Sequence, residues 1–192
     1  MQICLVMSFL TIPNRSRPPL PYRTANGILS NFLSLAGHKT VDMQTVSLNS
    51  VVNSIAPIIQ SDALMTDKSV LLMLNEIPPL LMDNNEIRQL ILNLARNGLE
   101  AMQPGGLLII RTRSDNGEVF LEVEDQGQGI PHEMLDKLGN PFQTTKENGS
   151  GLGLAVCYSI ANRHNAHIEV NTNSKGTIFS VRFPVGDTNS KL

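Results

Sequence analysis

The chain has 192 residues, of which 41% are hydrophobic and 4% aromatic, and it contains no tryptophan. This length and composition predict one domain with an aliphatic core and a short additional segment. The net charge of −2 excludes a general attraction to nucleic acids or to anionic membranes. The two cysteines, Cys4 and Cys157, have neither the spacing of metal ligands nor that of a disulfide framework, so a reducing cytoplasm is the expected compartment.

The first 40 residues are expected to lie outside the main domain. Residues 1–21 are predicted to be irregular, because four prolines in residues 13–21 prevent a continuous helix. Their apolar start is too short to span a bilayer and lacks the basic residues of a signal peptide. Residues 22–40 are predicted to contain one helix with apolar residues at helical spacing, which ends at Gly37 and continues as a linker.

From residue 41 to residue 186 the pattern predicts a single α+β domain, which leaves residues 187–192 as a tail. Runs with the twofold period of strands alternate there with runs that have the helical period. Because the strands are grouped with few helices, we expect a two-layer sandwich, with a mixed sheet and helices on one face. Helices are predicted over residues 49–64, after residue 83 and from residue 154, and strands near residues 46, 69–75, 80–82, 106–113, 118–124, 166–171 and 176–183.

The predicted helix after residue 83 carries two asparagines on one face. Residues 83–86 have the Asp-x-x-Glu spacing of a capping box, and an apolar helical run follows. Asn93 and Asn97 are four residues apart, so their carboxamides lie on the same face. Asparagine is unfavourable inside helices, and a carboxamide oxygen is a suitable ligand for Mg²⁺. A metal-binding face is therefore one interpretation, and a solvated polar face is the other.

Asp125 follows a predicted strand in which residues 119, 121 and 123 share one face, and Gly127 and Gly129 come next. A carboxylate at a strand end can accept a hydrogen bond from an exocyclic amine such as that of adenine. The glycines allow the backbone to approach a planar ring. The alternative interpretation is an ordinary Asp-Gly turn.

Three glycines at alternate positions, Gly149, Gly151 and Gly153, lead directly into an apolar helical run. Glycine leaves no side chain between the backbone and a ligand. The start of the helix directs free N–H groups and a positive dipole end towards an anion. Lys146 and two threonines precede these glycines. We interpret the segment as a phosphate-binding site, with a flexible turn before a helix as the alternative.

In this order the motifs resemble the GHKL ATPase superfamily, and specifically the catalytic ATP-binding domain of bacterial sensor histidine kinases. The resemblance includes the N box, the first glycine box, the F box with the lid, the second glycine box and the closing hairpin, which correspond to residues 93–97, 125–129, 141–146, 149–154 and 171–183. The N box region is similar to sporulation-type and nitrogen-regulator-type kinases. The resemblance implies a Bergerat-type ATP-binding fold over residues 41–186.

The resemblance also implies that ATP and Mg²⁺ are bound. Asn97 is expected to bind Mg²⁺, with Asn93 as a second candidate. Asp125 is expected to bind the adenine amine, and Thr177 to support adenine through water. The lid is expected to close onto the distal phosphates. The residues expected to bind ATP are Asn93, Arg96, Asn97, Asp125, Gly127, Gly129, Thr144, Thr145, Lys146, Gly149, Ser150, Gly151, Leu152, Gly153, Leu154 and Thr177.

The implied function is ATP-dependent phosphoryl transfer to a histidine within a two-component phosphorelay. The related gyrase and chaperone ATPases place a glutamate, which activates water, at the position of Asn93. Asparagine there favours slow hydrolysis and transfer to a protein histidine. The implied partners are a phosphoacceptor histidine domain and, indirectly, a response regulator, with no nucleic acid and no membrane contact by this segment.

The chain is not expected to supply its own phosphoacceptor histidine. The resemblance makes residues 22–40 the remnant of the second helix of a dimerisation hairpin, and no histidine precedes it, which favours a truncated or rearranged start. His38 has no acidic neighbour, and His132 is expected to be an exposed residue at a helix start. His164 and His167 are expected on the surface, on either side of a helix-to-strand junction.

Two alternatives to a histidine kinase remain at this point. One is a truncated nucleotide-binding interaction module without kinase activity. The other is an anti-sigma-type serine kinase of the same fold. The predicted helix within residues 22–40 favours the relatives of histidine kinases over the serine kinases.

Overall fold

The computed structural model describes residues 41–143 and 150–185. The order of its helices and strands confirms the predicted order, and the bounds differ by only a few residues. In chain order the elements are β1 (Gln44–Val46), α2 (Leu48–Leu64), β2 (Ser69–Leu74), β3 (Leu80–Met82), α3 (Asn84–Ala101), β4 (Leu107–Asp115), β5 (Glu118–Asp125), α4 (His132–Leu135), α5 (Gly153–Arg163), β6 (His167–Asn173) and β7 (Gly176–Pro184). The predictions for residues 1–40 and 187–192 lie outside the described residues, so the division of the chain into segments stays a prediction.

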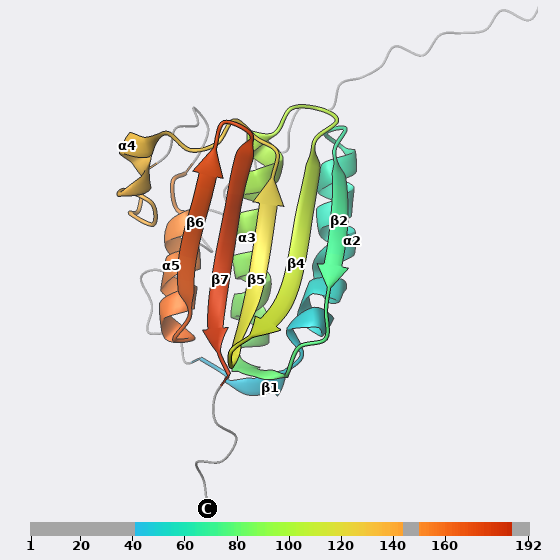
Figure 1. Ribbon diagram of the computed structural model, residues 1–192, viewed down its shortest axis with the longest axis vertical. Helices are drawn as coiled ribbons and strands as arrows, with labels where there is room; N and C mark the ends of the chain where they lie inside the picture. Colours follow the sequence, from blue (N-terminus) through green and yellow to red (C-terminus); the bar gives the residue numbers. More distant parts are fainter. Residues whose placement is uncertain (1–40, 144–149, 186–192) are drawn as a thin grey trace, which may run out of the picture.

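Five strands form one mixed sheet in the order β2-β4-β5-β7-β6. β2 is parallel to β4, and the other neighbouring strands are antiparallel. β1 and β3 form a separate antiparallel pair. Figure 1 shows α2, α3 and α5 together behind one face of the five-stranded sheet. This arrangement confirms the predicted two-layer α+β sandwich.

The hydrophobic core lies between the sheet and these three helices. In β5, Val119, Leu121 and Val123 are buried and alternate with half-buried residues, as the twofold period of a strand requires. The same alternation brings Asp125, the last residue of β5, to the buried face. In α3 the buried apolar side chains recur at helical spacing: Ile87, Leu90, Ile91, Leu94, Ala95 and Leu99. Burying one large apolar side chain contributes roughly 1.5–3 kcal/mol, so α3 is held firmly against the sheet.

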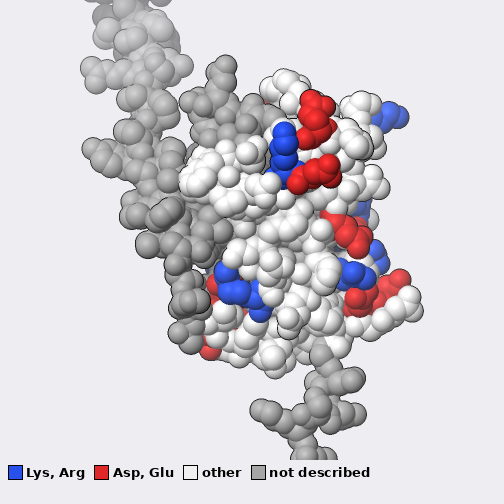
Figure 2. All heavy atoms as spheres, turned by 90° about the vertical axis from the view of Figure 1, so that its left-hand side faces the viewer, with Lys and Arg blue, Asp and Glu red and all other residues white. Residues whose placement is uncertain are grey.

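The outer face of the sheet carries charged side chains in pairs. Arg111 pairs with Glu124 across β4 and β5, and Arg113 pairs with Glu122 at 3.2 Å. The guanidinium of Arg113 also lies 3.7 Å from the centroid of the Phe120 ring. Such partly exposed pairs contribute little to stability, typically about 0–1 kcal/mol each. Acidic and basic side chains also lie next to one another on the side of the molecule where α4, α5 and β6 are found (Figure 2).

His164 is buried, so the prediction that placed it on the surface was wrong. Its Nε2 accepts a hydrogen bond of 3.0 Å from the backbone N–H of Asp83, and its Nδ1 lies 2.8 Å from the carbonyl oxygen of Ile160. The ring therefore joins the end of α5 to the start of α3, a contact that the local helix-to-strand pattern does not reveal. His167 is exposed at the start of β6, and His132 is exposed at the start of α4, as predicted.

The predicted capping box at the start of α3 is only half formed. As predicted, Oδ1 of Asp83 accepts hydrogen bonds from the backbone N–H groups of Asn85 (2.9 Å) and Glu86 (3.1 Å). The Asp83 N–H, which a capping box pairs with the glutamate, donates to His164 instead. Glu86 is fully buried and binds Arg163. Its role in a capping box was therefore predicted wrongly.

Candidate functional site

The asparagine face of α3 lies against the start of α5. The Nδ2 of Asn93 donates a hydrogen bond of 3.2 Å to the carbonyl oxygen of Gly153. Asn93 and Asn97 are both half-buried, between the buried side of α3 and its exposed residue Arg96. The structure therefore brings together residues of two motifs that lie 60 positions apart in the sequence.

The first turn of α5 has backbone N–H groups without an acceptor among the residues that the structure describes. Among the described residues no side chain caps this helix, whose N-cap position is taken by the buried Leu152. The chain reaches it through Gly151, at a φ of 66°, and the Gly151 carbonyl accepts a hydrogen bond of 3.0 Å from the Phe142 N–H. Ser150 Oγ accepts a weak hydrogen bond of 3.4 Å from the Leu152 N–H. Uncapped N–H groups at a helix start, together with the helix dipole, favour the binding of an anion.

Asp125 and Thr177 form a second polar site at the ends of β5 and β7. The two residues are paired in register and are 5% and 3% exposed. Oδ1 of Asp125 accepts a hydrogen bond of 2.8 Å from the Gly127 N–H, and the Thr177 hydroxyl lies 3.0 Å from that of Thr172. A cavity of about 150 Å³ adjoins both residues and also contacts Lys175. A buried carboxylate beside a buried hydroxyl provides the mixed acceptor and donor groups that a nucleobase edge requires.

Three glycines allow the chain to pack closely around Asp125. A Cβ at Gly98 of α3 would lie 3.1 Å from the Cβ of Asp125, and a Cβ at Gly176 would clash with the Asp125 carbonyl. A Cβ at Gly129 would clash with the carbonyl of Asn173. Gly129 is among the residues predicted to bind ATP, whereas Gly98 is not predicted by any motif. The sequence signal for Gly98 is its position on the buried side of an amphipathic helix. Gly176 lies within the predicted closing hairpin, residues 171–183.

Replacing Gly129 by alanine is expected to destabilise the domain. Gly129 has a φ of 76°, a conformation that costs a residue with a side chain about 1–3 kcal/mol, and the clash with Asn173 adds to this cost. Gly153→Ala is the matched control, because the nearest atom to a Cβ there lies 4.0 Å away and alanine favours a helix. Urea unfolding should give a lower unfolding free energy for Gly129→Ala only. Equal values for both variants would contradict the packing argument.

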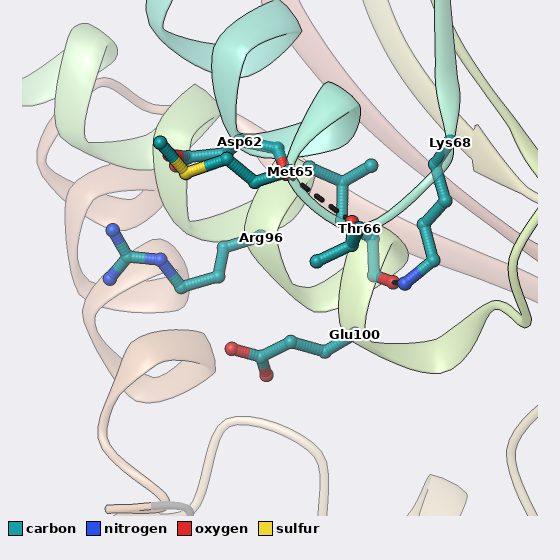
Figure 3. Close-up of a pocket in the computed structure, with 7 residues that line it drawn as sticks. Asp62, Met65, Thr66, Lys68, Arg96 and Glu100 are labelled. Atoms are coloured by element: carbon teal, nitrogen blue, oxygen red, sulfur yellow. Dashed lines mark hydrogen bonds between the residues drawn. The ribbon is translucent and has the colours of Figure 1, made fainter. Parts of the chain in front are cut away.

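Arg96 of α3 lines a different cavity from the one beside Asp125 and Thr177. This cavity has a volume of about 260 Å³ and lies beside the end of α2 (Figure 3). None of the other described residues predicted to bind ATP lines this cavity, whose lining consists of Asp62, Met65, Thr66, Lys68, Arg96, Leu99 and Glu100. Lys68 donates a hydrogen bond of 2.6 Å to the carbonyl oxygen of Leu99 and so caps the end of α3. The binding of ATP by Arg96 stays a prediction.

Four residues predicted to bind ATP lie outside the described residues, and their roles stay predictions: Thr144, Thr145, Lys146 and Gly149. Leu154, in the first turn of α5, is half-buried. Among the described residues no three His, Cys, Asp or Glu side chains are grouped as a metal site. A divalent cation at α3 would therefore depend on a carboxamide oxygen, on oxygens of the ligand and on water, a ligand set that suits Mg²⁺.

Cys157 lies between α5 and α3 but is not a nucleophile. Burial raises the pKa of the Cys157 thiol to about 12, although hydrogen bonding with Asn93 opposes part of this rise. Its Sγ donates a weak hydrogen bond of 3.7 Å to the carbonyl oxygen of Leu90. At neutral pH the thiol is therefore protonated and serves packing between the two helices.

Known proteins are similar to this chain in sequence and in fold. Sporulation kinase C of Bacillus subtilis is 30% identical over 161 residues, which are 82% of this chain and 38% of that protein. Sporulation kinase D of the same organism is 37% identical over 163 residues, which are 83% of this chain and 32% of that protein. The catalytic domain of the histidine kinase ThkA is 25% identical with a TM-score of 0.69, over 74% of this chain and 95% of that domain.

These similarities confirm the resemblance that the motifs predicted. The chain spans 38% and 32% of the two sporulation kinases. No helix among the described residues is long and apolar enough to cross a membrane. The family model described as histidine kinase-, DNA gyrase B- and HSP90-like ATPase matches residues 82–187, which is more than half of the chain and includes both polar sites. The chain therefore belongs to the family of histidine kinase-, DNA gyrase B- and HSP90-like ATPases.

Proposed function

We propose that this chain is the ATP-binding catalytic domain of a two-component sensor histidine kinase. It transfers the γ-phosphoryl group of ATP to a histidine that another segment or chain supplies. The observation that carries this proposal is the contact between Asn93 of α3 and Gly153 at the uncapped start of α5. A polar face suited to a metal ion and a helix start suited to phosphate thereby lie side by side.

The adenine ring is assigned to the site of Asp125 and Thr177. The Asp125 carboxylate is buried and faces the C-terminal half of α3 near Gly98, so water does not compete strongly for it. It accepts the exocyclic amine of adenine, while Thr177 reaches the ring through a water molecule. Hydrogen bonds that involve a charged group contribute about 1.5–3 kcal/mol, so this contact selects adenine among nucleobases.

The triphosphate is assigned to the start of α5, and Mg²⁺ to the asparagine face of α3. Asn97 holds the cation through its carboxamide oxygen, because the described residues offer no cluster of acidic or histidine ligands. Asn93 is the second candidate ligand. Its Nδ2 donates to the carbonyl oxygen of Gly153, which leaves its carboxamide oxygen for the cation. When bound, Mg²⁺ neutralises charge on the phosphate oxygens.

In this reaction the phosphorus–nitrogen bond to the acceptor histidine forms as the bond between the γ-phosphorus and the bridging oxygen of ADP breaks. For phosphoryl transfer the protein mainly has to position the reacting groups and to stabilise their charge. Residue 93 is an asparagine and not a carboxylate, so it cannot act as a general base for water. Asparagine at this position therefore favours slow hydrolysis and transfer to a protein acceptor.

The partners of this function are a phosphoacceptor hairpin that carries the histidine and a response regulator that receives the phosphoryl group afterwards. Among the histidines in the described residues, His132 and His167 are exposed, and His164 is buried with both ring nitrogens engaged. In this proposal none of these three histidines accepts the phosphoryl group, which goes to a histidine of another segment or chain. The cytoplasm, where ATP and the response regulator are present, is the proposed compartment.

Labelled ATP tests the proposed activity directly. We expect the chain alone to form no phosphohistidine, and to label a dimeric phosphoacceptor hairpin added in trans, at a reduced rate because no covalent linker raises its effective concentration. The control is the same hairpin with its acceptor histidine replaced by glutamine, which should remain unlabelled. Because phosphohistidine is labile in acid and stable in base, acid treatment should remove the label.

Three outcomes would contradict the proposal. ATP binding without any transfer to phosphoacceptor hairpins would favour a nucleotide-binding interaction module. An acid-stable label on a serine would favour a serine kinase of the same fold. Strong labelling of the chain alone that disappears in His132→Gln would show that this exposed histidine, which stands beside Glu133, is itself an acceptor.

A further inference from the structure

A buried polar cluster joins the start of α3 to the end of α5. The Glu86 carboxylate is fully buried and accepts two hydrogen bonds from the Arg163 guanidinium, at 2.9 and 3.1 Å. Arg163 also donates a hydrogen bond of 2.6 Å to the Ser159 hydroxyl, one turn back on α5. His164, the residue that follows α5, has its Nδ1 3.8 Å from the same carboxylate and accepts the Asp83 N–H.

This cluster is one of three polar contacts along the same pair of helices. Asn93 binds Gly153 at the start of α5, Cys157 contacts the Leu90 carbonyl in the middle, and Glu86 binds Arg163 at the end. In these three contacts the residue number of the α3 partner decreases as that of the α5 partner increases, so the two helices run antiparallel. α5 is therefore fixed at both of its ends relative to the helix that carries Asn93 and Asn97.

We propose that Glu86 is a positioning residue of the nucleotide site. By holding Arg163 at the end of α5, it sets the position and direction of the first turn of α5, about 15 Å away at 1.5 Å per residue. This inference rests on the proposed function, in which the amides of that turn bind the phosphates of ATP. Glu86 itself touches neither ATP nor the metal ion.

The chemistry of the cluster favours positioning over stabilisation. A buried ion pair loses the solvation of both charges, and an apolar group of similar volume often stabilises a fold equally well. The pair instead fixes the orientation of α5 relative to α3, because a guanidinium and a carboxylate form two parallel hydrogen bonds in one plane. Sliding or rotating α5 along α3 would break this geometry and leave the Glu86 carboxylate buried and unpaired.

The adenine site does not depend on this cluster. Asp125 and Thr177 belong to β5 and β7 and are held by Gly127, Thr172 and the pairing of the two strands. A shift of α5 should therefore weaken the binding of the phosphates and spare that of the base. The ratio of the affinities for ATP and for adenosine therefore measures the positioning effect. A merely structural role of Glu86 would not change this ratio.

The test is the substitution Glu86→Gln, which keeps the shape of the side chain and removes its charge. Calorimetric titration should show ATP binding weakened roughly tenfold, the order expected when a helix start loses its alignment with an anion. Adenosine binding should stay within about twofold. The control is Glu122→Gln, which removes the ion pair with Arg113 on the outer face of the sheet and should change neither affinity.

Two variants of Arg163 keep the proposal testable if Glu86→Gln does not fold. Arg163 is partly exposed, with 24% of its side chain accessible. Arg163→Gln should reproduce the selective loss of ATP binding, and Arg163→Lys, which keeps the charge, should recover part of it. An unchanged ratio of ATP to adenosine affinity in folded Glu86→Gln or Arg163→Gln would overturn the positioning role and leave the proposed function intact. Failure of the unmodified chain to bind ATP would overturn both.

Discussion

Replacing Asp125 by asparagine is expected to weaken ATP binding by about 10- to 150-fold without unfolding the domain. The variant keeps an acceptor oxygen for the Gly127 N–H, which lies 2.8 Å from Oδ1, so the local turn is preserved. What it loses is the negative charge that accepts the adenine amine. A charge-assisted hydrogen bond contributes about 1.5–3 kcal/mol, and a factor of ten in affinity corresponds to about 1.4 kcal/mol. Calorimetric titration of the folded variant with ATP measures this loss.

The same site predicts discrimination between ATP and GTP. Guanine presents a carbonyl oxygen where adenine presents its amine, so two acceptors would face each other at Asp125, and GTP should bind poorly to the unmodified chain. Glu122→Gln is the matched control, because Glu122 is an acidic residue of the same strand that pairs with Arg113 on the outer face and does not line the cavity beside Asp125. It should leave ATP affinity unchanged. Equal affinities for ATP and GTP would show that Asp125 does not recognise adenine.

Much of the fold can be predicted from the sequence, because burial imposes periodicity on neighbouring residues. The alternation in β5 predicts both the strand and the buried position of Asp125 at its end. The helical spacing after Asp83 predicts α3 and puts Asn93 and Asn97 on one face. The pairing of β7 with β5, which brings Thr177 beside Asp125, follows from the family resemblance and not from any local pattern.

The errors of prediction share one physical cause, which is a contact between residues far apart in the sequence. Glu86 fits a local capping pattern, yet its partner Arg163 is 77 positions away. Its spacing of four residues from Leu90 and eight from Leu94 already places it on the buried face of α3, and this signal could have indicated a buried partner. His164 was assigned to the surface because it follows a helix, although the start of α3 covers it.

The role of Arg96 stays a prediction. It lies within the N box, and the resemblance alone assigned it to the ATP site. In a helix each residue is rotated by about 100° from the previous one, so Arg96 points in a different direction from Asn97 but lies on the helix surface next to Asn93, three residues earlier. Arg96 lines the cavity beside α2, and Asn93 binds Gly153 of α5.

Replacing Asn97 by alanine is expected to remove the dependence of ATP binding on Mg²⁺. Because the described residues contain no cluster of acidic or histidine ligands, no such cluster there can take over the cation. The ratio of ATP affinities measured with Mg²⁺ and with excess EDTA should therefore fall towards one in the variant. In EDTA alone the variant and the unmodified chain should bind ATP equally, since the adenine site and the start of α5 are unchanged.

The control for this experiment is Asn85→Ala, which removes an exposed asparagine in the first turn of the same helix and should keep the full response to Mg²⁺. Asn93→Ala should give a different result from Asn97→Ala. Because the Nδ2 of Asn93 holds the carbonyl of Gly153, its loss should weaken ATP binding in EDTA as well as in Mg²⁺. If Asn97→Ala binds ATP with Mg²⁺ as tightly as the unmodified chain, the asparagine face of α3 is a solvated polar face and the cation is held elsewhere.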